Sequence, residues 1–331
     1  MIRALRYARA EGRVETLVGS QLTEAVADGR DPLWVDLGLP SAEETDLLTS
    51  LFGFDPLAIA ACFDRRCAAK AEQSGDALFL ILHGPDLSDP ARLGSRMLAA
   101  FLRPSLLVTV RLVPMPWVGE VQELARVQPR EVFREGVSRV LYCIVDRMLS
   151  QNSGRVEQLN EHVDRLEEEV ISGSVPDLLQ RVQAARHEVV SLRRLLAPQR
   201  RAAAELARGD FPQIPLDARA LFRNAHDQLT HLYEELDLER DGLAAVRDAH
   251  LAALSNRMNE LSLETNRVMK VLAMLSTVML PIGLVTGFYG MNFDFLPAAH
   301  ERWGAGLALG LTALLVGALL AFYRWAGWLG K

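Results

Sequence analysis

Two uncharged apolar segments near the C-terminus constrain this chain more than any other feature. The first reads VLAMLSTVMLPIGLVTGF over residues 271–288, and the second reads WGAGLALGLTALLVGALLAFY over residues 303–323. Each has about the twenty residues that a helix needs to cross the hydrocarbon core of a bilayer. The two segments therefore predict a pair of transmembrane helices, joined by a loop over residues 289–302, in a multi-pass membrane protein.

The charges that flank this pair predict its orientation. Arg267 and Lys270 precede the first segment and Arg324 follows the second, whereas the loop contains one basic residue, Arg302. Basic residues concentrate on the cytoplasmic side of membrane proteins. We therefore expect the long N-terminal region and the tail 324–331 in the cytoplasm, and the loop outside it.

The first part of the chain, residues 1–130, alternates between strand and helix patterns. Strands are predicted within residues 32–40, 76–84 and 96–113, the last range divided into two strands by Arg103-Pro104-Ser105. A helix follows Ser41, which has Glu44 three residues later and so forms the signature of a capping box. These patterns predict an α+β domain with a mixed sheet and flanking helices.

The next part of the chain is helical. Residues 131–215 predict a helical hairpin, whose second helix is expected to end before Pro198. Residues 216–288 predict one long stalk helix that continues into the first membrane segment, because no proline occurs between Asp217 and Leu280. At about 1.5 Å per residue, such a helix is on the order of 100 Å long.

Composition and motif searches exclude several classes of function. The 42 acidic and 36 basic side chains give a formal charge of −6, which disfavours a nucleic-acid partner. The three cysteines form no C-x-x-C pair, and His226 and His231 miss the spacing of helical metal ligands. No phosphate-binding glycine motif, zinc-protease motif or nucleophile elbow occurs. We therefore expect neither an enzyme nor an organic cofactor, and we interpret His83 as structural.

Three stretches together carry a family resemblance. They are NRVMKVLAMLSTVMLPIGLVTGFYGMNFDFLP, which contains the tripeptide Gly290-Met291-Asn292, the helical SLRRLLAPQRRAAAELARGDFP, and the early WVDLGLP. In these stretches the chain resembles the CorA family of divalent-cation channels, within the CorA/ZntB superfamily, over essentially its whole length. The family implies a homopentameric funnel in the inner (plasma) membrane that carries Mg²⁺, and also Co²⁺ or Ni²⁺, into the cell. It further implies influx driven by the membrane potential and gated by cytoplasmic Mg²⁺.

The resemblance also implies roles for particular residues. Tyr289, Gly290, Met291 and Asn292 match the selectivity loop, in which Asn292 supplies a ring of side-chain oxygens for the metal ion. The residues that match pore-lining or gating positions are Asn266, Met269, Leu272, Thr277, Leu280 and Gly287.

Elementary chemistry supports these assignments. Mg²⁺ gives up its water ligands reluctantly, so neutral asparagine oxygens can hold a hydrated ion without trapping it. Apolar side chains deeper in the pore can close it by excluding water. Positions 266, 269, 273, 276/277, 280 and 283/284 share one stripe of a helix. Pro281 leaves one backbone carbonyl of this helix without a hydrogen-bond donor.

The chain also departs from the family pattern. Ala273 and Gly283 replace threonines, Leu296-Pro297-Ala298-Ala299 lacks an acidic residue after the proline, and Asn224 stands where many relatives have aspartate. We therefore expect the regulatory cation site to be weakened or displaced towards Asp227. Two other functions stay open: a zinc transporter of the ZntB type, and a membrane-anchored signalling or scaffold protein.

Overall fold

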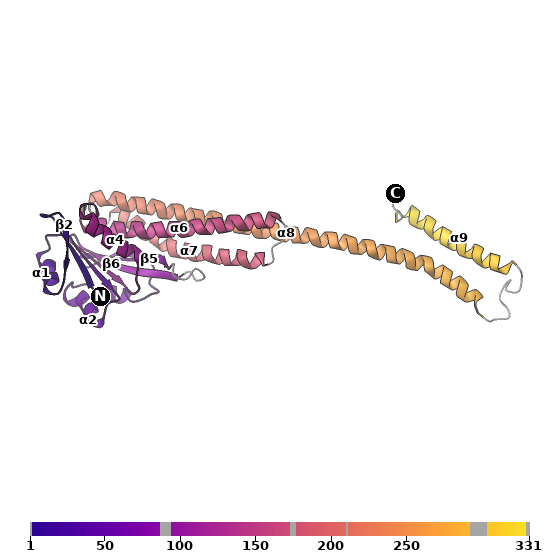
Figure 1. Cartoon of the computed structure of the whole chain (residues 1–331), viewed down its shortest axis with the longest axis horizontal. Coiled ribbons are helices and arrows are strands. Elements are labelled where there is room, and N and C mark those ends of the chain that lie inside the picture. Colours follow the sequence, from indigo (N-terminus) through magenta and orange to yellow (C-terminus); the bar gives the residue numbers. More distant parts are fainter. Residues whose placement is uncertain (1, 87–93, 173–176, 210, 292–302, 329–331) are drawn as a thin grey trace. The chain divides into compact units, whose positions relative to one another are not determined.

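The structure is a computed structural model that describes residues 2–86, 94–172, 177–209, 211–291 and 303–328. The chain divides into two compact units, residues 1–250 and 251–331. The boundary falls inside the longest helix, α8 (Leu216–Tyr289), which has 74 residues and no interruption. The predicted long stalk helix is thus confirmed, and it belongs to both units (Figure 1).

The described part of the first unit contains one seven-stranded mixed sheet in the order β2-β1-β3-β7-β6-β5-β4. Neighbouring strands are antiparallel except for β3 and β7, which run parallel. The strands are β1 (Ile2–Ala8), β2 (Arg13–Leu17), β3 (Leu33–Gly38), β4 (Lys70–Ser74), β5 (Ala77–Asp86), β6 (Gly94–Leu102) and β7 (Leu106–Arg111).

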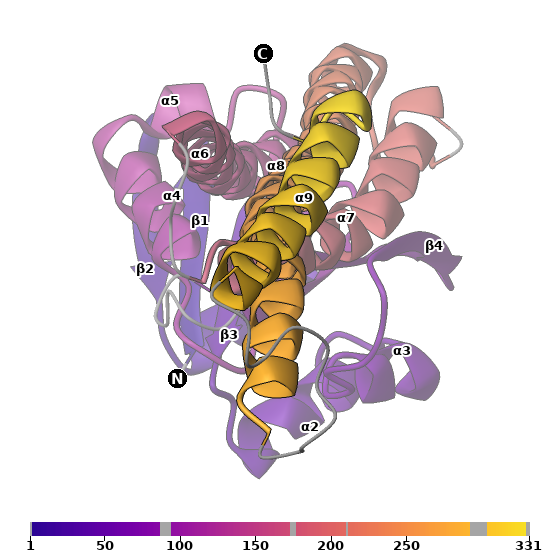
Figure 2. The same ribbon diagram turned by 90° about the vertical axis from the view of Figure 1, so that its right-hand side faces the viewer.

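Helices cover both faces of this sheet. One face packs against α1 (Ser20–Asp28), α2 (Ala42–Ser50) and α3 (Pro56–Ala61). The other packs against α4 (Pro116–Val127), α5 (Pro129–Val132), α6 (Val137–Ser172), α7 (Leu178–Arg208) and the first part of α8. Figure 2 shows α2 and α3 on the opposite side of the sheet from α6 and α7. The predicted mixed sheet with flanking helices is confirmed.

Two-sided burial explains the uninterrupted apolar sequences of the central strands. In β5, Leu78 and Leu80 face the α6–α8 side, whereas Phe79 and Ile81 face the α1–α3 side. Successive side chains of a strand point to opposite faces, so a strand covered on both sides needs apolar residues at every position. The stretch ALFLIL meets this need.

The structure confirms two sequence predictions that depend on hydrogen bonds between nearby residues. The Glu44 N–H donates to Ser41 Oγ (3.2 Å) and the Ser41 N–H donates to Glu44 Oε2 (2.9 Å), which confirms the capping box. Arg103 and Leu106 exchange backbone hydrogen bonds and close the predicted turn between β6 and β7. Strands β1, β2 and β4 were not predicted, because charged residues interrupt their short apolar pattern and β2 and β4 form the sheet edges.

The prediction that the second helix of the hairpin ends before Pro198 is wrong. Helix α7 continues to Arg208 with Pro198 in its interior. Leu192 and Leu196 before the proline, and Ala202 and Leu206 after it, are all buried in the same core. Their packing offsets the one backbone hydrogen bond that proline cannot donate.

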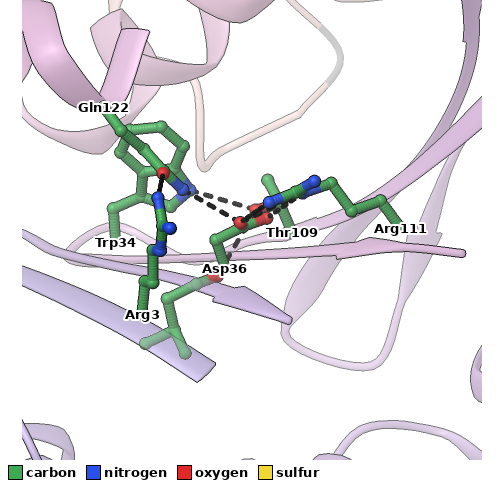
Figure 3. A network of polar contacts seen from close by, with 7 residues as sticks. Arg3, Trp34, Asp36, Thr109, Arg111 and Gln122 are labelled. Carbon is green, nitrogen blue, oxygen red and sulfur yellow. Dashed lines mark hydrogen bonds and ion pairs between the residues drawn. The ribbon is translucent and has the colours of Figure 1, made fainter. Parts of the chain in front are cut away.

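A buried carboxylate joins the sheet to α4 (Figure 3). Asp36 on β3 is 1% exposed. Its carboxylate accepts hydrogen bonds from Arg111 Nη2 (2.9 Å), Gln122 Nε2 (2.9 Å) and Thr109 Oγ1 (2.8 Å). Trp34 Nε1 donates to Thr109 Oγ1 at 3.1 Å. Because every oxygen of this carboxylate is hydrogen-bonded, the charge is tolerated inside the core.

The stretch WVDLGLP is therefore a structural motif. Trp34 and Asp36 belong to the buried network, and Gly38 lies where a Cβ would come within 2.9 Å of Arg111 Nη2. A side chain at position 38 would displace the guanidinium that neutralises Asp36. The motif explains how the parallel β3–β7 pair is joined, not how an ion is bound.

We predict that Asp36→Ala destabilises the protein by about 3 kcal/mol, because it leaves the partly buried Arg111 charge without its partner. The measurement is unfolding of the purified full chain by heat or denaturant, monitored by circular dichroism. Asp28→Ala is the matched control, since Asp28 forms an exposed ion pair with Arg30. Equal losses in the two variants would contradict a special role for the buried network.

Candidate functional site

The predicted pore-lining residues lie along the C-terminal part of α8, in the second unit. Asn266, Met269, Leu272, Thr277, Leu280 and Gly287 are all helical and all exposed in the single chain. Met269 is 61% and Leu280 68% exposed. Apolar side chains this exposed need lipid or other protein to cover them.

Five of these six residues share one side of the helix. At about 100° per residue, Asn266, Met269, Thr277, Leu280 and Gly287 fall within an arc of roughly 80°. We call these five residues the α8 stripe. Leu272 lies about 100° from the middle of this arc, on the flank of the helix.

Thr277 has two oxygen atoms, its side-chain hydroxyl and its backbone carbonyl, that can accept hydrogen bonds. Its hydroxyl donates to the Ala273 carbonyl at 2.7 Å, so the lone pairs of Oγ1 remain to accept from water. Pro281, four residues later, has no N–H to donate to the Thr277 carbonyl. The helix therefore offers two acceptors at Thr277 where the surrounding side chains are apolar.

Helix α8 ends immediately before Gly290, the first residue of the tripeptide that carries the family resemblance. Tyr289 is the last helical residue, and the Gly290 N–H donates to the Thr286 carbonyl at 2.9 Å. A Cβ on Gly290 would lie 3.0 Å from that carbonyl oxygen, so the backbone leaves little room for a larger residue. Met291 is exposed, and Asn292 lies outside the described residues.

The second apolar helix is α9 (Gly304–Trp325). Within the second unit, Val285 of α8 and Gly304 and Tyr323 of α9 are buried, and Lys270 Nζ lies 5.3 Å from the centre of the Trp328 ring. Most other described side chains of α9 are exposed. Both α8 and α9 contain a window long and apolar enough to cross a membrane.

The predicted regulatory residue Asp227 lies in the first unit, exposed on α8. One turn earlier, Asn224 Nδ2 donates to the Tyr142 hydroxyl (3.2 Å), and Tyr142 donates to Asp146 Oδ1 (3.3 Å). The Asn224 side chain is thus hydrogen-bonded to a residue of α6. Among the described residues, no group of three or more His, Cys, Asp or Glu side chains is placed to hold a metal ion.

A group of acidic side chains lies between α6 and α8. Burial raises the pKa of Glu239, and the charges of Asp164, Glu167 and Glu235 raise this pKa further. The sequence signals were LEEEV and LYEELDLERD, but neither shows that the two faces meet within one chain. Only the packing of α6 against α8 brings these carboxylates together.

These features define a class: a membrane protein whose soluble α+β unit continues, through one helix, into a pair of apolar helices. A family model described as CorA-like Mg²⁺ transporter protein matches residues 29–324, and the chain belongs to this family. It is therefore a divalent metal transporter of the CorA family rather than an enzyme.

Individual relatives agree with this assignment. The cobalt/magnesium transport protein CorA of Thermotoga maritima is 24% identical over 315 residues, which are 91% of this chain and 85% of the relative. The structure of the CorA magnesium transporter from Methanocaldococcus jannaschii superposes with a TM-score of 0.70 at 21% identity, covering 99% of both chains. The ZntB cytoplasmic domain from Vibrio parahaemolyticus superposes with a TM-score of 0.64 at 13% identity, covering 77% of this chain and 98% of that one. The fold of the first unit is thus shared with both a CorA and a ZntB structure, so this fold does not indicate whether the chain transports Mg²⁺ or Zn²⁺.

We predict that Glu239→Gln raises the melting temperature at pH 7, on the order of 1 °C because solvent screens this partly exposed group. The pKa of Glu239 is higher in the folded state than its ordinary value of 4.5, so its ionised form disfavours folding. This cost is present above the folded pKa and disappears as the pH falls below 4.5. The stabilisation by Gln should therefore shrink towards zero as the pH is lowered from 7 to 4.

The measurement is thermal unfolding of both proteins across this pH range. Glu234→Gln, at an exposed position of the same helix, is the matched control. A melting-temperature difference that is independent of pH would contradict the assignment to the Glu239 carboxyl.

Proposed function

We propose that this protein is a Mg²⁺ channel of the inner membrane, which also admits Co²⁺ or Ni²⁺, and that its N- and C-termini are cytoplasmic. The observation that carries the proposal is the continuity of α8. The same helix contributes buried residues such as Phe222 and Leu236 to the soluble core and then presents the exposed α8 stripe, which ends beside Gly290 and Met291. A helix built in this way can transmit a change in the soluble unit to the membrane.

The assembly that suits this helix is a homopentamer around a common axis. Between Ala218 and Val246 the apolar residues of α8 recur at heptad-like steps and are buried within the chain. A second run with the same four- and three-residue steps, Leu254, Met258 and Leu261, begins eight residues after Val246 and is exposed in the single chain. Equivalent helices of other copies would cover these residues, while lipid would cover the outward faces of α8 and α9.

Selectivity in this proposal rests on neutral oxygens. A ring of Asn292 side chains at the outer mouth would hold a hydrated Mg²⁺, and Tyr289, Gly290 and Met291 would position that ring. The C-terminal end of α8, whose last carbonyls carry partial negative charge, points at the same loop and favours a cation there. Deeper in the pore, Thr277 and Asn266 would accept hydrogen bonds from the water shell of the ion.

In this proposal, apolar residues that lie between the polar positions of α8 close the pore. Met269, Leu272 and Leu280 would exclude water when the helices are close together. Cytoplasmic Mg²⁺ bound between subunits, with Asp227 as one ligand, would hold the closed state. Its loss would free the stalk helices to tilt. Influx would then follow the membrane potential, which is worth about 4.6 kcal/mol per 100 mV for a divalent ion.

We predict potential-driven Mg²⁺ entry into liposomes that contain the purified protein and an internal Mg²⁺-sensitive dye. Asn292→Ala should abolish most of this entry, because it removes the proposed oxygen ring. Asn256→Ala is the matched control, since Asn256 is exposed on α8 outside the α8 stripe. The same liposomes test Zn²⁺ and an imposed pH gradient.

Other outcomes would change the assignment. Zn²⁺ entry without Mg²⁺ entry, driven by protons, would place the protein with zinc transporters. Flux that survives Asn292→Ala unchanged would refute the selectivity ring. No flux of either ion would favour a signalling or scaffold role.

We also predict that native mass spectrometry of the detergent-solubilised chain yields five copies per particle. Replacing Met258 and Leu261 by Gln should weaken this assembly, because these exposed apolar residues recur at heptad-like spacing and would contact the neighbouring helices. Replacing Leu57 and Val127 by Gln is the matched control at exposed apolar positions of the first unit. A monomer or dimer in the wild type would refute the pentamer.

A further inference from the structure

A cavity of about 330 Å³ lies in the first unit, away from every residue of the proposed transport path. Its walls come from the segment before β4, from β5 and β6, and from α7. The polar side chains that line it are Arg65, Arg66, Arg194, His83, Ser95 and Ser191. Three arginines and two serines are thus among its lining residues, and none of the lining residues that the structure describes carries a carboxylate.

A tight turn presents two of the arginines. The Cys67 N–H donates to the Asp64 carbonyl at 3.0 Å, which makes Arg65 and Arg66 the central residues of the turn. The carboxylate of Asp64 is directed to the backbone, because its Oδ1 accepts from the Arg66 N–H at 2.9 Å. Among the described residues, no carboxylate forms an ion pair with either guanidinium.

The third arginine comes from α7, at the point where Pro198 interrupts the helical hydrogen bonding. Arg194 is exposed and lines the cavity, as Pro198 does. Proline has no N–H to donate to the carbonyl four residues earlier, which belongs to Arg194. Pro198 and the buried Leu192 add an apolar wall beside the guanidinium groups.

His83 lines the cavity with a buried imidazole ring, one of whose nitrogen atoms lacks a hydrogen-bond partner among the described residues. The residue is 8% exposed, and its Nε2 lies 2.7 Å from the Cys67 carbonyl oxygen. Because a carbonyl only accepts, Nε2 carries the proton and Nδ1 is left as an acceptor. Burial lowers the pKa of His83, which favours this neutral form. Among the described residues Nδ1 has no hydrogen-bond partner, although the sequence predicted a satisfied structural histidine.

We propose that this cavity binds a phosphate monoester, with the phosphate on the three arginines and the organic part against Leu192 and Pro198. Guanidinium groups bind phosphate oxygens through paired, charge-assisted hydrogen bonds, and serine hydroxyls can add further donors. A hydroxyl or amine of the ligand donates to His83 Nδ1. A divalent cation does not suit this cavity, because its charged lining side chains are cationic.

The test is isothermal titration of the full-length protein in detergent with three probes: AMP, inorganic phosphate and adenosine. We expect AMP to bind, phosphate to bind more weakly and adenosine not to bind. The combined variant Arg65→Gln and Arg194→Gln should raise the dissociation constant for AMP at least about tenfold, through the loss of charge-assisted hydrogen bonds. Both arginines are exposed, so this variant is expected to fold.

Arg201→Gln is the matched control, because Arg201 is exposed on the same helix but does not line the cavity. His83→Asn tests the acceptor and should weaken AMP binding more than phosphate binding. The absence of AMP binding, an equal loss in Arg201→Gln, or equal affinity for AMP and inorganic phosphate would overturn the proposal. The titration measures binding alone, so its outcome does not depend on whether the protein transports Mg²⁺.

Discussion

The hydrophobic effect is the interaction on which the rest of this structure depends, because a single chain can bury only part of its apolar surface. In the first unit, α6, α7 and the start of α8 pack their apolar faces against the sheet and against one another. In the second unit, Met269, Leu280 and most of α9 remain exposed. Such surface is stable only in a bilayer or against other protein chains. Insertion into a bilayer would meet this requirement for α8 and α9, and contact with other protein chains would meet it as well.

The soluble unit gives α8 a rigid base. The central strands β5 and β6 are buried on both faces, and the Asp36 carboxylate is held by donors from β7 and α4. Close-packed cores move between discrete arrangements rather than deforming smoothly. The first part of α8 belongs to this core through buried residues such as Phe222 and Leu236.

The charges of the soluble unit are separated into regions with different chemistry. Carboxylates gather between α6 and α8 around Glu239, whereas arginines gather at the cavity beside α7. In the first region, burial and then the charges of the neighbouring carboxylates raise the pKa of Glu239. The second offers hydrogen-bond donors to an anion. The formal charge of −6 conceals this division, because the net charge of a chain does not report where charges of each sign lie.

The sequence by itself determined the features that depend on neighbouring residues. The two apolar segments, the uninterrupted α8, the capping box at Ser41 and Glu44, and the turn at Arg103 follow from local hydrogen bonding, hydrophobicity and helix period. The candidate pore residues followed from a family resemblance and from their shared helical stripe. Only the tertiary structure decided that β1, β2 and β4 join the sheet, that α7 passes through Pro198, and that His83 faces a cavity with Arg65 and Arg194. These outcomes depend on contacts between residues far apart in the chain, whose packing energy outweighs the local preference of a proline or a charged strand.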